Sequence, residues 1–336
     1  MDSEIAKLTR LIKKLPEGRV GEVVEMVEKI IEENTPKETP DCPHCEASAN
    51  LVVRFGKNGD KQRYRCNSCG RYFSDGTKSA AASSRYGEAV WKQVIRDTLT
   101  GVSLDGTAKS LSVTHSTAFH MRHKILCLAE TAQALKNTEL TGVCEIDDTY
   151  VLESVKGTKI PEDYHREPRK HGAKASKRGI SAEQISIMTG ISRDGPILTK
   201  TVNRATPRKE DVTAVFNGHI GKSTLVLCDG AKSIASLRDV AEVSNVKNDP
   251  DSFYHINNVN GYHSFIKRRQ NNIYHGIATK YQNRYNALYS LAYGCDTEEQ
   301  IDTLYNMLIQ KSGQFGRKVS ELKTVDILDL GQLVNC

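Results

Sequence analysis

The sequence lacks any hydrophobic run long enough to cross a membrane, and its N-terminal residues do not have the pattern of a secretory signal peptide. Only 38% of its 336 residues are hydrophobic, yet the composition does not have the signature of intrinsic disorder. These features argue against an integral membrane protein and a disordered chain. They favour a cytoplasmic protein of two or three globular domains.

Disulfides are not expected either, because the nine cysteines are an odd number and accompany no secretory signal. Four of them form two Cys-x-x-Cys pairs, Cys42/Cys45 and Cys66/Cys69, separated by twenty residues. Two such pairs can supply four thiolates to one tetrahedral zinc ion, with no position left open for water. We therefore predict a zinc ribbon over residues 40–78, in which a β-hairpin joins the pairs and the zinc is structural.

The ribbon is rich in basic and aromatic residues, which favours contact with DNA. A ribbon that docks onto another protein is the alternative. The residues concerned are Arg54, Lys57, Lys61, Arg63, Arg65, Arg71, Tyr64, Tyr72 and Phe73.

Helical patterns lie on both sides of the ribbon. Residues 1–35 have apolar positions at helical spacing, which predicts a helical hairpin packed on the body of the protein or, alternatively, an oligomerisation arm. Residues 84–135 predict a helix-turn-helix, with a turn at Ser112-Val113. Its second helix is the expected recognition helix, and an ordinary helical bundle is the alternative. The side chains expected to reach bases are His115, Ser116, His120 and Arg122.

Two adjacent carboxylates lie in the predicted strand 143–150. Neighbouring side chains in a strand point to opposite faces, so only one carboxylate can face a given site. We take Asp147 as the first ligand of a magnesium ion, because an unpaired acid in a strand core needs a compensating partner. A strand-end carboxylate in a turn is the alternative interpretation.

The pattern from residue 142 onward predicts three strands, a helix and a fourth strand that ends at Asp229. In a ribonuclease-H-like fold the first and fourth strands are neighbours, which would bring Asp147 and Asp229 together. A helix over residues 255–269 would then present Asn260 and Lys267 on one face, since seven residues leave them about 20° apart. We place the catalytic domain at residues 141–295 and a C-terminal helical extension at residues 296–336.

Most of the net charge of +6 comes from residues 156–178, which contain eight Lys and Arg residues and three acids. Such a local basic stretch predicts an anionic partner, most simply nucleic acid, and a loop that becomes ordered on it. The residues expected to contact DNA are Lys170, Lys174, Lys177 and Arg178.

Over residues 40–295 these motifs together resemble bacterial insertion-sequence transposases of the ISXO-like group. The resemblance rests on the four paired cysteines, the helix pair 107–124, Glu145–Tyr150, Cys228–Ser233, His255–Gly261 and Lys267-Arg268. It implies a multidomain α/β protein: N-terminal helices, zinc ribbon, helix-turn-helix, then a ribonuclease-H-like mixed α/β catalytic domain. Related proteins usually have Glu where this chain has Asn260, which resembles an Asp-Asp-Asn-Lys variant within the group. Asp148 and Leu152-Glu153 also depart from the usual Glu and Gly-Gly.

The resemblance implies magnesium-dependent cleavage and strand transfer of DNA at the ends of an insertion sequence, with manganese as a substitute metal. Asp147 would bridge two metal ions, Asp229 would bind one and Asn260 the other, and Lys267 would hold a phosphate. The implied partners are double-stranded DNA, both element ends and target, and further copies of this chain on that DNA in a bacterial nucleoid. The alternative is a non-catalytic zinc-ribbon and helix-turn-helix DNA-binding protein, either a degenerate transposase or a regulator, which needs no paired Asp147 and Asp229.

Overall fold

The computed structural model describes residues 39–309, except for residues 60, 75, 78, 83, 136–137, 158–159, 161, 163, 165–174, 194, 247–251 and 295. The predicted hairpin of residues 1–35 and the part of the predicted C-terminal extension after residue 309 lie outside the described residues. The chain divides into two compact units, Met1–Asp75 and Gly76–Cys336. None of the helices among the described residues is long and apolar enough to span a bilayer.

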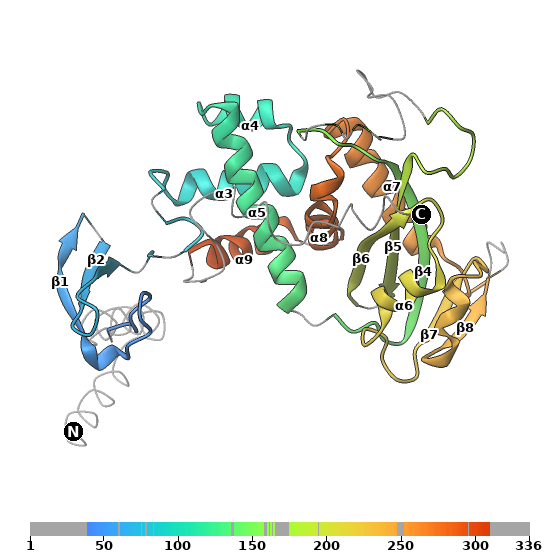
Figure 1. Ribbon diagram of the computed structural model, residues 1–336, viewed down its shortest axis with the longest axis horizontal. Helices are drawn as coiled ribbons and strands as arrows, with labels where there is room; N and C mark the ends of the chain where they lie inside the picture. The colour runs from blue at the N-terminus through green and yellow to red at the C-terminus, as the bar shows by residue number, and fades with distance from the viewer. Residues whose placement is uncertain are drawn as a thin grey trace, which may run out of the picture. The chain divides into compact units, whose positions relative to one another are not determined.

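The described part of the first unit is a small antiparallel sheet with strand order β1-β2-β3 (Figure 1). A short 3-10 helix, η2 (Ala49–Leu51), leads into β1 (Val52–Asn58), which is followed by β2 (Lys61–Cys66) and β3 (Tyr72–Ser74). β1 and β2 form the hairpin between the cysteine pairs that the sequence predicts. One face of the sheet is its core, made of Cys42, Val52, Tyr64, Cys66 and Phe73.

The second unit contains a five-stranded mixed sheet with strand order β6-β5-β4-β7-β8. Its strands are β4 (Val143–Leu152), β5 (Gln184–Ser192), β6 (Ile197–Arg204), β7 (Leu225–Cys228) and β8 (Glu242–Asn245). The first three form an antiparallel meander, whereas β7 lies parallel to β4 and β8 parallel to β7. The first and fourth strands are therefore neighbours, as the sequence predicts for a mixed α/β domain.

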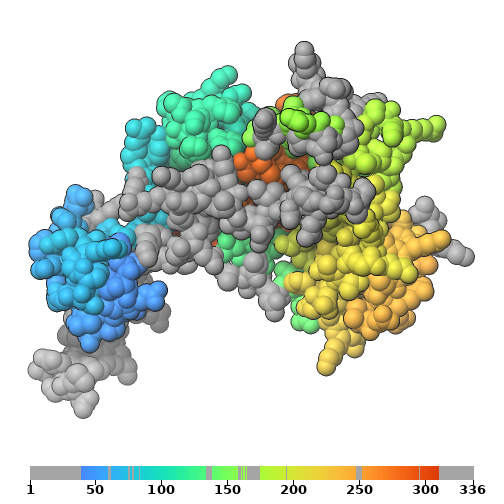
Figure 2. Space-filling view, in the orientation of Figure 1, coloured from blue at the N-terminus to red at the C-terminus, as the bar shows by residue number. Residues whose placement is uncertain are grey.

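Helices cover both faces of this sheet (Figure 1). On one face, α6 (Lys209–Phe216) and η3 (Ile234–Asp239) pack on alternate residues of β4, including Cys144 and Ile146. On the other face lie α7 (Asn257–Arg268) and α8 (Gln282–Ala292), which contact β4 and β6. The region of β7 and β8, yellow to orange in Figure 2, lies at the surface, where β8 forms one edge of the sheet.

The remaining helices are α3 (Glu88–Thr100), α4 (Leu104–Ser110), α5 (His115–Leu135) and α9 (Thr297–Ile309). The turn between α4 and α5 includes Ser112, whose φ of 51° is in the left-handed region. Of these, α3, α5 and α9 share one hydrophobic core with α7 and α8, which includes Trp91, Ile125, Leu288 and Leu304. Helix α4 contacts α5. The short segments η4 (Arg269–Ile273) and η5 (Thr279–Tyr281) connect α7 to α8.

Candidate active site and zinc site

The N-terminus of α7 is fixed to β4 by Glu145, a carboxylate with no exposed surface. Its Oε2 accepts hydrogen bonds from the backbone N–H groups of Asn258 (2.8 Å) and Val259 (3.1 Å). Its Oε1 accepts from Asn258 Nδ2 (2.8 Å) and Arg193 Nε (3.1 Å). The first N–H groups of a helix have no partner within the helix, and a carboxylate there is also favoured by the helix dipole. Glu145 thus caps α7 from a strand that is more than a hundred residues earlier.

This anchor sets the position of α7 along β4. On α7, Val259 contacts Glu145 and His263, four residues later, contacts Asp147. On β4, Asp147 is two residues after Glu145. Four helical residues rise about 6 Å, and two strand residues span about 6.6 Å, so helix and strand advance together. The helix therefore presents successive turns to the alternate side chains of one face of β4.

His263 is the side chain of α7 that meets Asp147. Its Nδ1 lies 3.6 Å from Asp147 Oδ2, and its side chain is 6% exposed, whereas that of Asp147 is 16% exposed. The buried Nε2 of His263 has no hydrogen-bond partner among the described residues. Sequence reasoning missed this residue, although its position between Asn260 and Lys267 at helical spacing was a usable signal.

Asp147 and Asp229 lie level with each other on neighbouring strands. Glu145 on β4 is paired with Leu227 on β7 in parallel register, and each aspartate is two residues further along. Side chains two residues apart on a strand share a face, so Asp147 lies on the same face of the sheet as Glu145 and Leu227, and Asp229 follows Leu227 by two residues. Asp229 is exposed just beyond the end of β7, where its Oδ1 accepts a hydrogen bond from Ala231 N (3.0 Å).

Asn260 and Lys267 are both exposed on α7. Going around the helix axis, His263 lies within about 60° of Asn260 and about 40° of Lys267. Because His263 faces Asp147, both residues border the side of α7 that approaches the sheet edge. An amide and an ammonium group therefore lie on a solvent-exposed side of the helix, next to the side that contacts β4.

Asp148 belongs to the opposite face of β4. Its Oδ2 accepts a hydrogen bond from the Tyr150 hydroxyl (2.9 Å). Burial raises the pKa of Asp148 to about 6, the Tyr150 hydrogen bond opposes this rise, and the negative charges of Asp147 and Asp229 add to it. Glu153, the next acidic side chain on this segment, is 1% exposed and forms an ion pair with Arg204 (2.6 Å), so it is not available to a metal.

The four paired cysteines converge in the first unit, and their sulfur atoms all lie within 4.8 Å of one another. Cys42 Sγ is 3.7 Å from Cys69 Sγ, and Cys45 Sγ is 3.7 Å from Cys66 Sγ. A tetrahedral site with zinc–sulfur bonds of about 2.3 Å requires sulfur atoms about 3.8 Å apart. This cluster is therefore compatible with a structural zinc ion.

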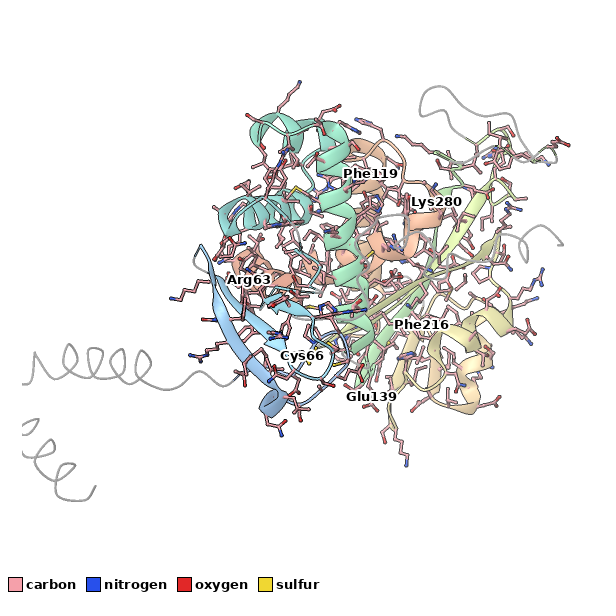
Figure 3. All side chains as sticks on the ribbon, turned by 60° about the vertical axis from the view of Figure 1, so that its left-hand side comes forward. Arg63, Cys66, Phe119, Glu139, Phe216 and Lys280 are labelled. Atoms are coloured by element: carbon pink, nitrogen blue, oxygen red, sulfur yellow. The ribbon has the colours of Figure 1, made fainter. Side chains whose placement is uncertain are left out.

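The ribbon has a buried and an exposed face, and the prediction for its aromatic residues was partly wrong. Tyr64 and Phe73 are 5% and 4% exposed and stack in the core, so they cannot contact DNA. The outer face instead carries Phe55 and Tyr72, which are 46% and 45% exposed, with ring centroids 4.8 Å apart. Arg63, on the same strand as Cys66 (Figure 3), lies over the Tyr72 ring, as Arg65 does.

In the helix pair, His115, Ser116 and His120 are exposed on α5, whereas Arg122 is 1% exposed. The prediction that Arg122 reaches bases is therefore wrong: its Nη2 donates to Val102 O (2.6 Å) inside the protein. In the basic stretch, Lys177 and Arg178 are exposed, and Lys170 and Lys174 lie outside the described residues.

Residues 139–289 match the family model described as the ISXO2-like transposase domain. A relative, an uncharacterized protein in the transposable element ISH50 of Halobacterium salinarum, is 28% identical over 147 residues. The match covers 42% of this chain and 45% of the relative, so it spans less than half of the relative's length. These two findings confirm the resemblance to ISXO-like insertion-sequence transposases.

Two solved structures are more distantly similar. The Mos1 strand transfer complex is 13% identical with a TM-score of 0.27, covering 70% of this chain and 79% of that chain. The Mos1 mariner paired-end complex with Mn is also 13% identical with a TM-score of 0.27, covering 72% and 81%. At these TM-scores the two structures establish neither a common fold nor a common activity.

Proposed function

We propose that this chain, whose residues 139–289 belong to the ISXO2-like transposase domain family, cleaves DNA at the ends of an insertion sequence and joins them to target DNA. The observation that carries the proposal is the register of the parallel strands β4 and β7, which places Asp147 on β4 level with Asp229 just beyond the end of β7, with α7 packed on β4. A DNA-binding regulator without catalysis would not need two carboxylates in this arrangement.

The donor set suits magnesium, which prefers hard oxygen ligands. Asp147 and Asp229 would hold the metal through carboxylate oxygens, and Asn260 would offer a neutral amide oxygen. Magnesium at such a site supplies charge stabilisation for phosphoryl transfer. His263, on α7, contacts Asp147 and would orient its carboxylate. Asp229 and Asn260 are exposed to solvent, so DNA can reach them.

Lys267 is the residue that we assign to the phosphate. Its ammonium group is exposed on the side of α7 that borders the sheet edge, and Lys acts on phosphates as a point charge. Asn260 brings no negative charge, so the site is less neutralised than one with Glu at this position. We expect the additional positive charge to be balanced by the DNA phosphate itself.

DNA would be held by surfaces outside this site. The exposed residues His115, Ser116 and His120 are near the N-terminus of α5, where a recognition helix contacts bases. Lys177 and Arg178 and the outer face of the ribbon add cationic side chains for the backbone. The zinc ion would stabilise the ribbon without taking part in chemistry.

The experiment that tests this proposal is cleavage of duplex DNA carrying the element's own end, with magnesium, by the wild-type protein and by Asp147→Ala. We expect the wild type to nick the end and join it to target DNA. Asp147→Ala should bind the same DNA and leave it intact, because no neighbouring carboxylate can take its place. A wild-type protein that binds the end but cuts it with neither magnesium nor manganese would show a degenerate, non-catalytic DNA-binding protein instead.

A further inference from the structure

A cavity of about 500 Å³ lies in the second unit, between α4, the N-terminal half of α5 and residues 273–285. Two of its lining residues, Phe119 on α5 and Lys280 in η5, are labelled in Figure 3. Cavities of about 300–1,000 Å³ are the size that holds small-molecule ligands. The proposed active site uses none of the residues of this cavity.

The cavity is lined by a buried cation, Arg122, that has no counter-ion within the described part of the chain. Arg122 is 1% exposed, and its Nη2 donates to Val102 O (2.6 Å) and to Thr107 Oγ1 (3.3 Å). Among the described residues, its buried Nε has no hydrogen-bond partner and no carboxylate forms an ion pair with it. The guanidinium lies over the ring of Tyr274, 5.7 Å from the centroid. A buried charge is costly unless an opposite charge accompanies it, so this position favours an anionic ligand.

The other charged residues of the lining strengthen that preference. Lys156 and Lys280 add two cations, and the single carboxylate of the lining, Asp105, lies 3.7 Å from His115. Burial lowers the pKa of His123 to about 3, and the positive charges of Arg284 and Arg122 contribute to this. The ring of His123 is therefore neutral at physiological pH, and at 2% exposure it packs against the rings of Phe119 and Tyr281.

Three rings form an aromatic wall in the same cavity. The ring centroids of Phe119 and His123 are 4.1 Å apart, and those of His123 and Tyr281 are 4.3 Å apart. Phe119 and Tyr281 are separated by 6.4 Å between centroids. Aromatic surfaces beside cationic groups are the combination on which nucleic-acid bases stack.

We infer that this cavity binds one nucleotide, with its phosphate at Arg122, Lys156 and Lys280 and its base against Phe119 and Tyr281. The nucleotide can be free in solution or part of a DNA strand. The cavity shares its lining residue His115 with the exposed N-terminal turn of α5, so a strand bound there could place one unpaired nucleotide in it. For the DNA strand the inference rests on the proposed function; for a free nucleotide it does not.

The test uses the full-length protein and 2-aminopurine deoxyribonucleoside 5′-monophosphate, whose fluorescence is quenched when the base stacks on aromatic rings. We expect the wild-type protein to quench the fluorescence saturably. Arg122→Met should bind the nucleotide with about tenfold lower affinity, a loss of about 1.4 kcal/mol of binding free energy. Phe119→Leu should also weaken binding, and the corresponding nucleoside without phosphate should bind more weakly than the nucleotide. The matched control is Arg238→Met, which removes an exposed arginine of η3 and should bind like the wild type.

Absent quenching, or equal affinity in all variants, would overturn the inference. If Arg122→Met does not fold, as judged by circular dichroism, Lys156→Gln at an exposed position of the lining takes its place beside Phe119→Leu. Photo-crosslinking with end DNA that carries 5-iododeoxyuridine identifies the source: a crosslink to the peptide of Phe119 or Tyr281 indicates a DNA strand, and its absence with intact nucleotide binding indicates a free nucleotide. Asp147→Ala should bind the nucleotide normally, so failure of this site and failure of catalysis are separable.

Discussion

His263 Nδ1 lies 3.6 Å from Asp147 Oδ2, with the imidazole buried between α7 and β4. This contact joins the helix that carries Asn260 and Lys267 to the strand that carries the first proposed metal ligand. We propose that a ring held in this way restricts the orientation of the Asp147 carboxylate, as residues around metal ligands commonly do.

We expect His263→Ala to lower the rate of end cleavage by about 10- to 100-fold, because the carboxylate of Asp147 loses the group that orients it. DNA affinity should remain that of the wild type, since His263 is buried. His263→Gln, whose side chain is of similar length and has an amide that can donate to Asp147, should recover part of the rate. Equal rates for His263→Ala and the wild type would mean that Asp147 is oriented by other groups.

Glu145 is expected to determine the stability of α7 on the sheet. Glu145→Ala leaves Arg193 without its carboxylate and two backbone N–H groups without acceptors. The free energy of unfolding of Glu145→Ala should be lower than that of the wild type by about 3–5 kcal/mol, the usual cost of breaking a buried ion pair. Urea denaturation measures this, with Glu242→Ala on the exposed edge strand β8 as the control. A loss as small as that of the control would show that α7 is held by apolar contacts alone.

The cysteine cluster predicts zinc in the purified protein. Cys66→Ser removes one of four thiolates, so metal analysis should find zinc lost and the ribbon unfolded, because structural zinc binding and folding are coupled. Cys127→Ser, at a buried cysteine of α5 outside the cluster, should retain the zinc. Stoichiometric zinc in purified Cys66→Ser would contradict the assignment.

The basic stretch predicts a salt-dependent affinity for DNA. Replacing the exposed residues Lys177 and Arg178 by Gln should flatten the slope of log K against log salt by about 0.9 for each DNA phosphate that the protein no longer neutralises. Lys222→Gln, at an exposed position before β7, serves as the control for removing a surface cation elsewhere. An unchanged slope in the double variant would mean that this stretch does not contact DNA.

Local patterns predicted a large part of this fold. The β-hairpin between the cysteine pairs, the meander of β4, β5 and β6, and α7 each have a pattern that lies within one segment. The strand β8 was missed because its four residues have no clear apolar alternation. The neighbouring position of β4 and β7 came from the fold that the resemblance implies, because no local signal specifies it.

The errors and omissions concern contacts between distant segments. Glu145 is part of the motif Glu145–Tyr150, but its role as the cap of α7 depends on Asn258, 113 residues later in the sequence. Arg122 follows Met121, a core residue of α5. The local sequence pattern does not reveal that residues 273–285 lie against the side of α5 that carries Arg122. Likewise, alternation in β2 and β3 separates Tyr64 from Arg63 but does not indicate which face of the ribbon is buried.

The metal dependence of DNA cleavage by an Asp229→Cys variant is the most direct test of the proposal that Asp229 holds the catalytic metal. A thiolate is a poor ligand for magnesium and a better one for softer divalent ions such as manganese. Cleavage of end DNA by Asp229→Cys should therefore be lost with magnesium and at least partly restored with manganese, whereas Asp229→Ala should be inactive with both. Two results would contradict a role of Asp229 as a metal ligand. One is cleavage by Asp229→Cys at the wild-type rate with magnesium, and the other is equal residual cleavage by Asp229→Cys and Asp229→Ala with manganese.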